Sequence, residues 1–349
     1  MAVDLSKLIS KRRLDLEELK GKIVAIDAYN FIYQFLSIIR QPDGTPLVDS
    51  KGNVTSHLSG IFFRTAEMIS KGIKPVYVFD GIPSMLKQKT INARMNRRNE
   101  AMREWEAAKA SGNLEEARQH AMASTRITKE IVASAKELLE NMGVAYIDAP
   151  SEGEAQASHM CKKGVVDMVA SQDYDTMLFG APLVVRNLTF SGRRKLPKRN
   201  IYIEVYPELV SLEETLKQLG LTQSQLIWVG MMLGTDFNDG IKGIGPKTAV
   251  KIAKEAQSLD YIESIAKEKY KQDFEVDPKS VERLFIEPEV KEVSREEINA
   301  MLGKKPDMQK LMDFMCKEHG FAEERISKYA QAIGKSKEQS NQRRMDSWF

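Results

Sequence analysis

The sequence predicts an α/β fold built around a mainly parallel sheet. Four short apolar segments typical of buried strands alternate with helical segments, at 22–30, 73–81, 142–150 and 165–175. Strands buried on both faces belong to parallel sheets whose connections are helices. Each segment also ends at or just before acidic residues. Because ligands of open α/β sheets gather at the carboxyl ends of the strands, the pattern that predicts the fold also locates a candidate site.

The predicted strands place six carboxylates at one edge of the sheet. KIVAIDAYN and IKPVYVFDG each lead to one aspartate, MGVAYIDAP runs into a helix that begins SEGEAQA, and VVDMVASQDYD ends in two aspartates. In chain order the six are Asp27, Asp80, Glu152, Glu154, Asp173 and Asp175. A seventh carboxylate, Asp236, lies in LGTDF at the end of an apolar helix, next to a glycine turn.

The segment 84–140 is charged, favours helix and is too long for a plain crossover between two strands. We expect helices that project from the sheet edge, with one break at SGN. The basic first part contains Lys87, Arg94, Arg97 and Arg98. A charge run is usually a solvated helix face. This run, however, begins seven residues after Asp80, so Lys87 and Arg94 are expected beside the carboxylates, where cations hold a phosphate and offset developing charge.

The rest of the chain is expected to be a hairpin followed by helices. Residues 183–207 read as two strands around a basic turn, and residues 226–256 as a helix, a glycine turn and a second helix. Residues 257–334 are predicted to be helical, and the tail 335–349 is polar until its last residues. We therefore predict one domain over 1–334, with an insertion at about 84–130, followed by a flexible tail.

Composition limits the partners. Lysine plus arginine total 52 against 49 aspartate plus glutamate, so the net charge is only +3 and a polyanion-binding protein of this kind must separate its acids from its bases. No apolar run is long enough to cross a bilayer, and the start, MAVDLSKLISKRR, has no apolar signal-peptide core. Two cysteines without metal-ligand spacing favour a reduced, intracellular compartment.

Seven carboxylates at one sheet edge would repel one another, and several would bind protons at neutral pH unless cations neutralise them. Mg²⁺ prefers oxygen ligands, whereas the four histidines form no ligand-like cluster for zinc. Two ions about 3.5–4 Å apart activate water and stabilise the leaving oxygen of a phosphodiester. The pattern therefore predicts a two-metal phosphodiesterase site. Local alternatives are a capping box from Ser151 to Glu154 and a turn at SQDYD, but neither explains why the pairs converge.

The stretch GIKGIGPKTA (240–249) reads as a glycine turn that enters a helix, with Pro246 in the first turn, where its missing N–H costs nothing. Free amides at a helix N-terminus bind phosphate without reading bases. Gly243 and Gly245 would let the backbone come close to a ligand, and Lys242, Lys247 and Lys251 add positive charge on that side. The alternative is an ordinary packing corner between two helices.

Taken together, these motifs resemble the flap endonuclease family of structure-specific 5′ nucleases. VAIDAYNFIYQFL, PVYVFDG, DAPSEGEAQA, SQDYDTMLFG and LGTDFNDGIKGIGPKTA look like its motifs, in its order, over nearly the whole chain. The resemblance implies a PIN-like nuclease core, a helical arch threaded by a single-stranded 5′ flap, and a helix–two-turn–helix element that grips duplex DNA. It also implies a 5′-flap endonuclease with 5′–3′ exonuclease activity, which acts in Okazaki fragment maturation and repair, and we expect a monomer.

The resemblance also implies roles for the carboxylates and the first cations. Two sets of ligands would hold two Mg²⁺ ions, and the family implies Mn²⁺ as a substitute for them. The first set is Asp80, Glu152 and Glu154, with Asp27 in an outer shell, and the second is Asp173, Asp175 and Asp236. Lys87 and Arg94 match the cations that contact the scissile phosphate.

Further contacts with DNA follow from the same resemblance. Tyr33 matches an aromatic residue on which a base near the cut can stack. The turn around Gly240, Ile241 and Ile244 matches a K⁺ site that bridges backbone carbonyls to DNA phosphate, and Arg325 falls in the region of a 3′-flap pocket. The chain departs from the family pattern at Ala2, Ile82 and His319, none of which is an expected metal ligand.

The terminal QRRMDSWF resembles the peptide that docks on sliding clamps. Its contact residues would be Gln342, Met345, Trp348 and Phe349. One turn of helix would set Met345 beside the two aromatics as a hydrophobic plug, and the polar segment before it would act as a tether that raises the local concentration at DNA. The alternative is a terminal aromatic pair packed on its own domain.

Two other functions stay open. One is a related 5′ nuclease of the excision or junction-cutting branches, against which the compact arch region and the clamp-like tail argue. The other is a catalytically inactive DNA-binding scaffold, which would require a missing carboxylate, and none of the seven expected carboxylates is missing.

Overall fold

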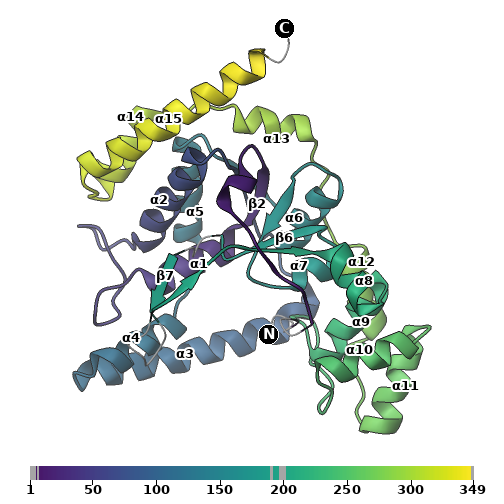
Figure 1. The fold of residues 1–349 in the computed structure, drawn as a ribbon. Helices are drawn as coiled ribbons and strands as arrows, with labels where there is room; N and C mark the ends of the chain where they lie inside the picture. The colour runs from purple at the N-terminus through teal and green to yellow at the C-terminus, as the bar shows by residue number, and fades with distance from the viewer. Residues whose placement is uncertain (1–4, 6–7, 189–191, 196–201, 347–349) are drawn as a thin grey trace.

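The structure is a computed structural model that describes residues 5, 8–188, 192–195 and 202–346, with the backbone alone described in 192–195, 202–203 and 337–346. Within these residues, seven strands form one sheet in the order β1-β9-β6-β5-β2-β3-β4, and β7 and β8 form a separate hairpin (Figure 1). The strands are β1 (Arg12–Arg13), β2 (Ile23–Asp27), β3 (Lys74–Phe79), β4 (Ala145–Asp148), β5 (Met168–Ala170), β6 (Leu183–Arg186), β7 (Gly192–Lys195), β8 (Tyr202–Val205) and β9 (Glu208–Ser211).

The sheet is parallel through its centre, which confirms the predicted α/β class. β2 pairs in parallel with β3 on one side and β5 on the other, and the parallel pairing continues to β4 and β6. Only β9 and β1, at the far edge, run antiparallel to their neighbours. The chain adds β3 and β4 on one side of β2 and then returns to add β5 and β6 on the other. This reversal, between β2 and β5, is where open sheets bind ligands.

Helices cover both faces of the sheet, which explains the continuous apolar runs of the strands. Along β2, Ile23 and Ala25 face one core and Val24 and Ile26 face the other, as the period of two in a strand requires. The first core receives α6 and α8–α13, and the second receives α1, α2, α5, α14 and α15. Along the described part of the chain, every helix is too short or too polar to cross a membrane.

The helices occupy most of the chain outside the strands. Beside short 3-10 helices at Leu16–Leu19 and Met85–Lys87 and a π-helical turn at Asp313–Glu318, the helices are α1 (Ala28–Ile38), α2 (Ser56–Ser70), α3 (Gln88–Ala110), α4 (Leu114–Ala123), α5 (Lys129–Asn141), α6 (Gly153–Lys162), α7 (Asp175–Leu178), α8 (Leu212–Leu219), α9 (Gln223–Leu233), α10 (Pro246–Glu255), α11 (Leu259–Tyr270), α12 (Pro278–Ile286), α13 (Arg295–Leu302), α14 (Met308–Met312) and α15 (Glu323–Asp346).

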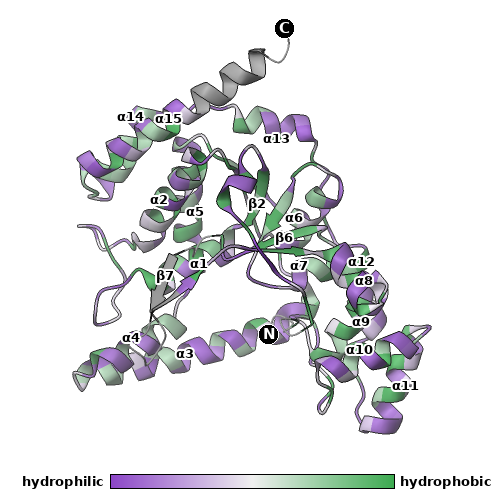
Figure 2. Ribbon diagram, viewed as in Figure 1, coloured by the Kyte–Doolittle hydropathy of each residue, from purple (hydrophilic) through white to green (hydrophobic). Residues whose placement is uncertain are grey.

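The helices α3 and α4 form the projecting element that the sequence predicts. α3 ends at Ala110 and α4 begins at Leu114, so the chain breaks at SGN as expected. α3 buries only Ala101 and Ala108, and Figure 2 shows it as a mainly hydrophilic helix that runs apart from the sheet. The following helix α5 is different, because Leu138 and Leu139 are fully buried in the core. The projection therefore ends before residue 129.

Two predicted segments differ from the structure. Two strands around a basic turn are predicted for residues 183–207, and β7 and β8 pair in this way, but β6 at the start of the segment pairs with β9 in the main sheet. The sequence also predicts a flexible tail from residue 335, whereas α15 continues to Asp346. Residues 335–346 contain no proline and are rich in lysine, arginine, glutamine and glutamate, which favour helix. The division at residue 334 stays a prediction.

Candidate active site

The parallel strands bring their carboxylates to one edge of the sheet. Asp27 ends β2, Asp80 follows β3, and the turn after β5 leads into α7 at Asp175. Because these strands are neighbours and run the same way, side chains at their carboxyl ends lie close together. Asp27, Glu152, Asp175 and Asp236 are all less than a tenth exposed. Burial of so many acids is rare unless cations or hydrogen bonds compensate.

Local geometry orients the first acids. Asp27 caps helix α1, and its Oδ1 accepts a hydrogen bond from the amide of Asn30 at 2.9 Å. Oδ1 of Asp80 accepts from the amide of Gly153 at 2.7 Å. A Cβ at Gly153 would lie 2.6 Å from that same oxygen, so only glycine permits the contact. Gly153 of SEGEAQA therefore lets Asp80 approach the start of α6.

The capping box expected from Ser151 to Glu154 is wrong. The N-cap of α6 is Glu152, and its side chain makes no capping hydrogen bond. Oε1 of Glu154 instead accepts from the hydroxyl of Ser171, at 2.8 Å, in the turn after β5. Glu154 thus bonds to the turn that leads to the second pair of acids rather than to its own helix start.

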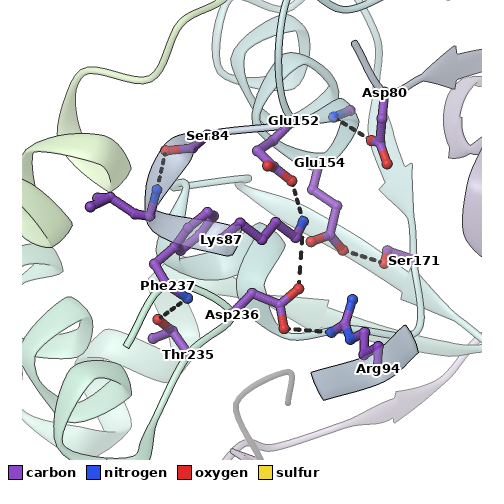
Figure 3. A network of polar contacts seen from close by, with 12 residues as sticks. Asp80, Ser84, Lys87, Arg94, Glu152, Glu154, Ser171, Thr235, Asp236 and Phe237 are labelled. Carbon is purple, nitrogen blue, oxygen red and sulfur yellow. Dashed lines mark hydrogen bonds and ion pairs between the residues drawn. The ribbon is translucent and has the colours of Figure 1, made fainter. Parts of the chain in front are cut away.

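Two cations from the base of the arch lie among these acids, as the sequence predicts. The ammonium of Lys87 forms ion pairs with Glu152 and, at 3.5 Å, with Oδ2 of Asp236. Nη2 of Arg94 lies 2.5 Å from Oδ1 of Asp236. Figure 3 shows Lys87 between the two carboxylates and Arg94 beyond Asp236. Segments that are far apart in sequence therefore contact one another here: the arch base through its two cations, the start of α6 through Glu152, and the segment before the glycine turn through Asp236.

Burial and mutual repulsion perturb the acids. Burial, reinforced by neighbouring carboxylates, raises the pKa of Asp27 to about 8. Burial likewise raises the pKa of Asp80 to about 6 and the pKa of Glu154 well above its ordinary value. Asp236 is the exception: burial disfavours its charged form, but the two cations outweigh burial and lower its pKa. For Asp27 and Glu154, burial and the neighbouring carboxylates outweigh the groups that favour the charged form.

The donor set fits hard divalent cations. Its ligand atoms are carboxylate oxygens, and among the described residues Oε1 of Glu152 is a buried atom without a hydrogen-bond partner. Within the same residues no three acidic, histidine or cysteine side chains are already arranged as a metal-binding group. The ammonium of Lys87 contacts two of the expected ligands in this arrangement. Glu152 also lines a cleft of about 430 Å³ between residues 82–85 and 284–289, so this side is open to a ligand.

The expected DNA contacts on the arch lie near the acids. Arg98 lies over the ring of Tyr33, with the guanidinium carbon 5.7 Å from the ring centroid. The Tyr33 ring is part-exposed on α1, which begins directly after Asp27. Arg97, on the same helix as Arg98, is exposed. Arg98 lies one helical turn after Arg94 on the same side of α3, whereas Arg97 is exposed to solvent. The contact of either arginine with DNA stays a prediction.

The backbone of the glycine turn requires glycine at two positions, and whether the turn binds a ligand stays a prediction. Gly243 has φ of +89°, a conformation that L side chains rarely adopt, and a Cβ at Gly240 would lie 2.5 Å from the carbonyl of Leu233. Pro246 opens α10 as expected, and Lys242, Gly243, Gly245 and Lys247 are exposed around that helix start. The carbonyl of Gly240 accepts a hydrogen bond from Gln272 at 3.4 Å.

The residues expected at the 3′-flap region lie away from the acids. Arg325 belongs to α15, which Figure 1 places at the opposite end of the molecule from α10. Its guanidinium lies over Phe63, 4.1 Å from the ring centroid. His319 pairs with Asp49 at 2.9 Å. Of the residues predicted to contact a clamp, Gln342 and Met345 belong to α15, whereas Trp348 and Phe349 lie outside the described residues.

Sequence reasoning missed two residues that hold the acids or the turn that carries them. Ser171 donates to Glu154, and Arg186 contacts the turn that carries Asp173. Arg186 is the last residue of β6, the strand next to β5. The rule that locates the acids, that functional residues gather at the carboxyl ends of neighbouring strands, applies equally to this arginine.

Comparison with known proteins shows the family to which the chain belongs. Family models described as the XPG N-terminal domain and the XPG I-region match residues 1–101 and 143–236. The whole chain is 45% identical to flap endonuclease 1 of Pyrococcus horikoshii, over 98% of that protein. The structure is similar to flap endonuclease-1 from Methanococcus jannaschii, with a TM-score of 0.73, 37% identity and coverage of 97% of this chain and 99% of that chain.

A further similarity is to the catalytic core of Rad2 in complex with a DNA substrate, with a TM-score of 0.69, 25% identity and coverage of 95% of this chain and 100% of that chain. The expected nuclease fold is thereby confirmed. Because the identity extends over the full length and includes both family regions, the chain belongs to the flap endonuclease family.

Proposed function

We propose that this chain is a divalent-metal-dependent nuclease that cuts 5′ flaps from branched DNA, with 5′–3′ exonuclease activity, in replication and repair. The observation that supports this most is the meeting of seven acids from four strand ends and a helix turn with two cations from the arch base. Membership of the flap endonuclease family supports the choice of substrate.

In the proposed site, Asp80, Glu152 and Glu154 hold one Mg²⁺, with Asp27 in support, and Asp173, Asp175 and Asp236 hold the other. Mn²⁺ has the same ligand preferences and would replace it. When bound, such a pair supplies an activated water and stabilises the leaving oxygen. Lys87 and Arg94 would turn from the carboxylates to the scissile phosphate and offset the charge that develops on it.

The rest of the molecule would bind DNA by its backbone. The exposed amides at the start of α10, with Lys242 and Lys247, suit a phosphate of the duplex, and the carbonyls of the Gly240–Ile244 turn suit a K⁺ ion beside it. The arch would receive the single-stranded flap, with Tyr33 stacking on a base near the cut.

The C-terminal peptide would dock on a sliding clamp. Gln342 and Met345 occupy one face of a helical turn at the end of α15, three residues apart. We place the protein inside the cell, as a monomer on DNA, with the clamp as its protein partner.

The test is cleavage of a labelled double-flap DNA by the purified protein, compared with duplex, nicked and bubble DNA. We expect Mg²⁺-dependent cutting of the double flap that chelation abolishes. Asp175→Asn and Glu154→Gln should bind the flap DNA but not cut it. Cutting by either variant at near wild-type rate would contradict the metal assignment, and preference for the bubble would favour an excision-type nuclease.

A further inference from the structure

Arg186 contacts the backbone beside the second set of acids. Its Nε donates to the carbonyl of Gln172 at 3.2 Å, and its Nη1 donates to the hydroxyl of Tyr174. Its guanidinium carbon also lies 4.3 Å from the centroid of the Tyr174 ring. Gln172 and Tyr174 are the neighbours of Asp173 on either side. The Arg186 side chain thus bonds to the residue before and the residue after Asp173, an expected metal ligand.

The guanidinium is itself held in place. Arg186 pairs with Glu208 across the sheet, and its side chain lies 3.8 Å from the Glu208 carboxylate. Only 18% of the Arg186 side chain is exposed, and Tyr174 is 4% exposed. A planar, part-buried guanidinium that stacks on an aromatic ring while donating two hydrogen bonds has little freedom to move. It can therefore fix the position of the turn.

The turn needs such a support. The amide of Asp173 donates to Oγ of Ser171 at 3.1 Å, and the hydroxyl of Thr176 donates to the carbonyl of Asp173 at 3.0 Å. These bonds are local and neutral, whereas the acids of this edge repel one another.

We propose that Arg186 is a positioning residue that holds the turn 171–175 so that Asp173 and Asp175 face the other acids before any metal arrives. It acts through the carbonyl of Gln172 and the ring of Tyr174, not on the scissile phosphate. The proposal rests on the metal site proposed above. Supports of this kind around metal ligands are worth about 10–100-fold in metal affinity or activity.

The experiment measures Mn²⁺ binding to the full-length protein without DNA, by the electron paramagnetic resonance of free Mn²⁺. Arg186→Ala should weaken binding at the affected site by about 10–100-fold. Arg186→Lys keeps the charge but cannot stack on Tyr174 and donate to Gln172 together, so it should stay weaker than wild type. The matched control is Lys11→Met. Lys11 lies 3.7 Å from the same Glu208 and over the same tyrosine ring, but has no bond to the turn.

The same variants then cut double-flap DNA over a range of Mg²⁺ concentrations. We expect Arg186→Lys to need more Mg²⁺ for half-maximal rate and to recover most of its rate at saturation, while Lys11→Met behaves as wild type. Full Mn²⁺ affinity in Arg186→Lys would show a role of charge alone and overturn the proposal, as would full affinity in Arg186→Ala. If the wild type bound no Mn²⁺, the metal site itself would be refuted and this inference with it.

Discussion

Replacement of Lys87 by methionine removes the cation that is closest to the expected metal ligands. The ammonium pairs with Glu152 and lies 3.5 Å from Asp236, and only 17% of the side chain is exposed. In the proposed mechanism this charge faces the phosphate as negative charge develops. Loss of one such group typically costs about 10²–10³ in rate, which corresponds to about 2.7–4 kcal/mol. We expect a fall of that size in Lys87→Met.

The assay is single-turnover cleavage of a double-flap DNA with enzyme in excess, alongside the dissociation constant measured by fluorescence anisotropy. Because binding draws on many phosphate contacts, affinity should fall by no more than about tenfold. A contact that strengthens in the transition state lowers the rate much more than the affinity. The two measurements together therefore distinguish a catalytic contact from general attraction of DNA.

Lys89→Met is the matched control. Lys89 lies two residues further along the chain and pairs with Asp239 and Glu275, but its side chain is 62% exposed. Exposed ion pairs are worth about 0–1 kcal/mol, so this variant should lose little rate. Equal losses of rate in the two variants, or a loss of affinity in Lys87→Met as large as its loss of rate, would refute the reasoning.

Three further predictions concern other parts of the molecule. Lys247→Ala should weaken binding to duplex-containing DNA of any sequence and reduce the log–log salt slope by up to about 0.9, and an unchanged slope would remove Lys247 from the interface. Burial, with a contribution from His319, lowers the pKa of His57 from 6.5 to about 3. The neutral imidazole therefore stabilises the folded state fully above pH 6.5, and this stabilisation is lost as the pH falls below 6.5. The free energy of unfolding of the wild type relative to His57→Gln should therefore decrease by about 1.4 kcal/mol per pH unit between pH 6 and 4, and a constant difference in denaturant titrations would contradict this. Deletion of 341–349 should leave cleavage of free flap DNA intact and abolish stimulation by a ring-shaped clamp, whereas loss of basal activity would show that the segment belongs to the fold.

The acids were predictable because a simple rule relates them. Short apolar strands in an α/β pattern must lie in parallel, and the ends of parallel strands meet at one edge. Asp27, Asp80 and Asp175 needed no more than this. Asp236 was predictable because it follows an apolar helix and precedes a glycine turn. The structure places it beside the same sheet edge, where Arg94 contacts its carboxylate.

The sequence could not determine which hydrogen-bond partner a side chain takes or which strand pairs with which. Ser151 and Glu154 satisfy the capping-box pattern, but Glu154 bonds to Ser171, which only the packing of α6 against β5 brings within reach. The pairing of β6 with β9 across an intervening hairpin likewise depends on tertiary contacts, since all four segments have strand character. Arg186 was missed for the same reason: its partner is a backbone carbonyl, which no sequence pattern reveals.

The central claim is that these acids hold two divalent ions at one catalytic site. Anomalous diffraction from crystals of the full-length protein soaked in Mn²⁺ tests it most directly. We expect two peaks about 3.5–4 Å apart, one contacting Glu152 or Glu154 and the other contacting Asp173, Asp175 or Asp236. A single peak, or two peaks that lie outside this group of acids, would contradict the account.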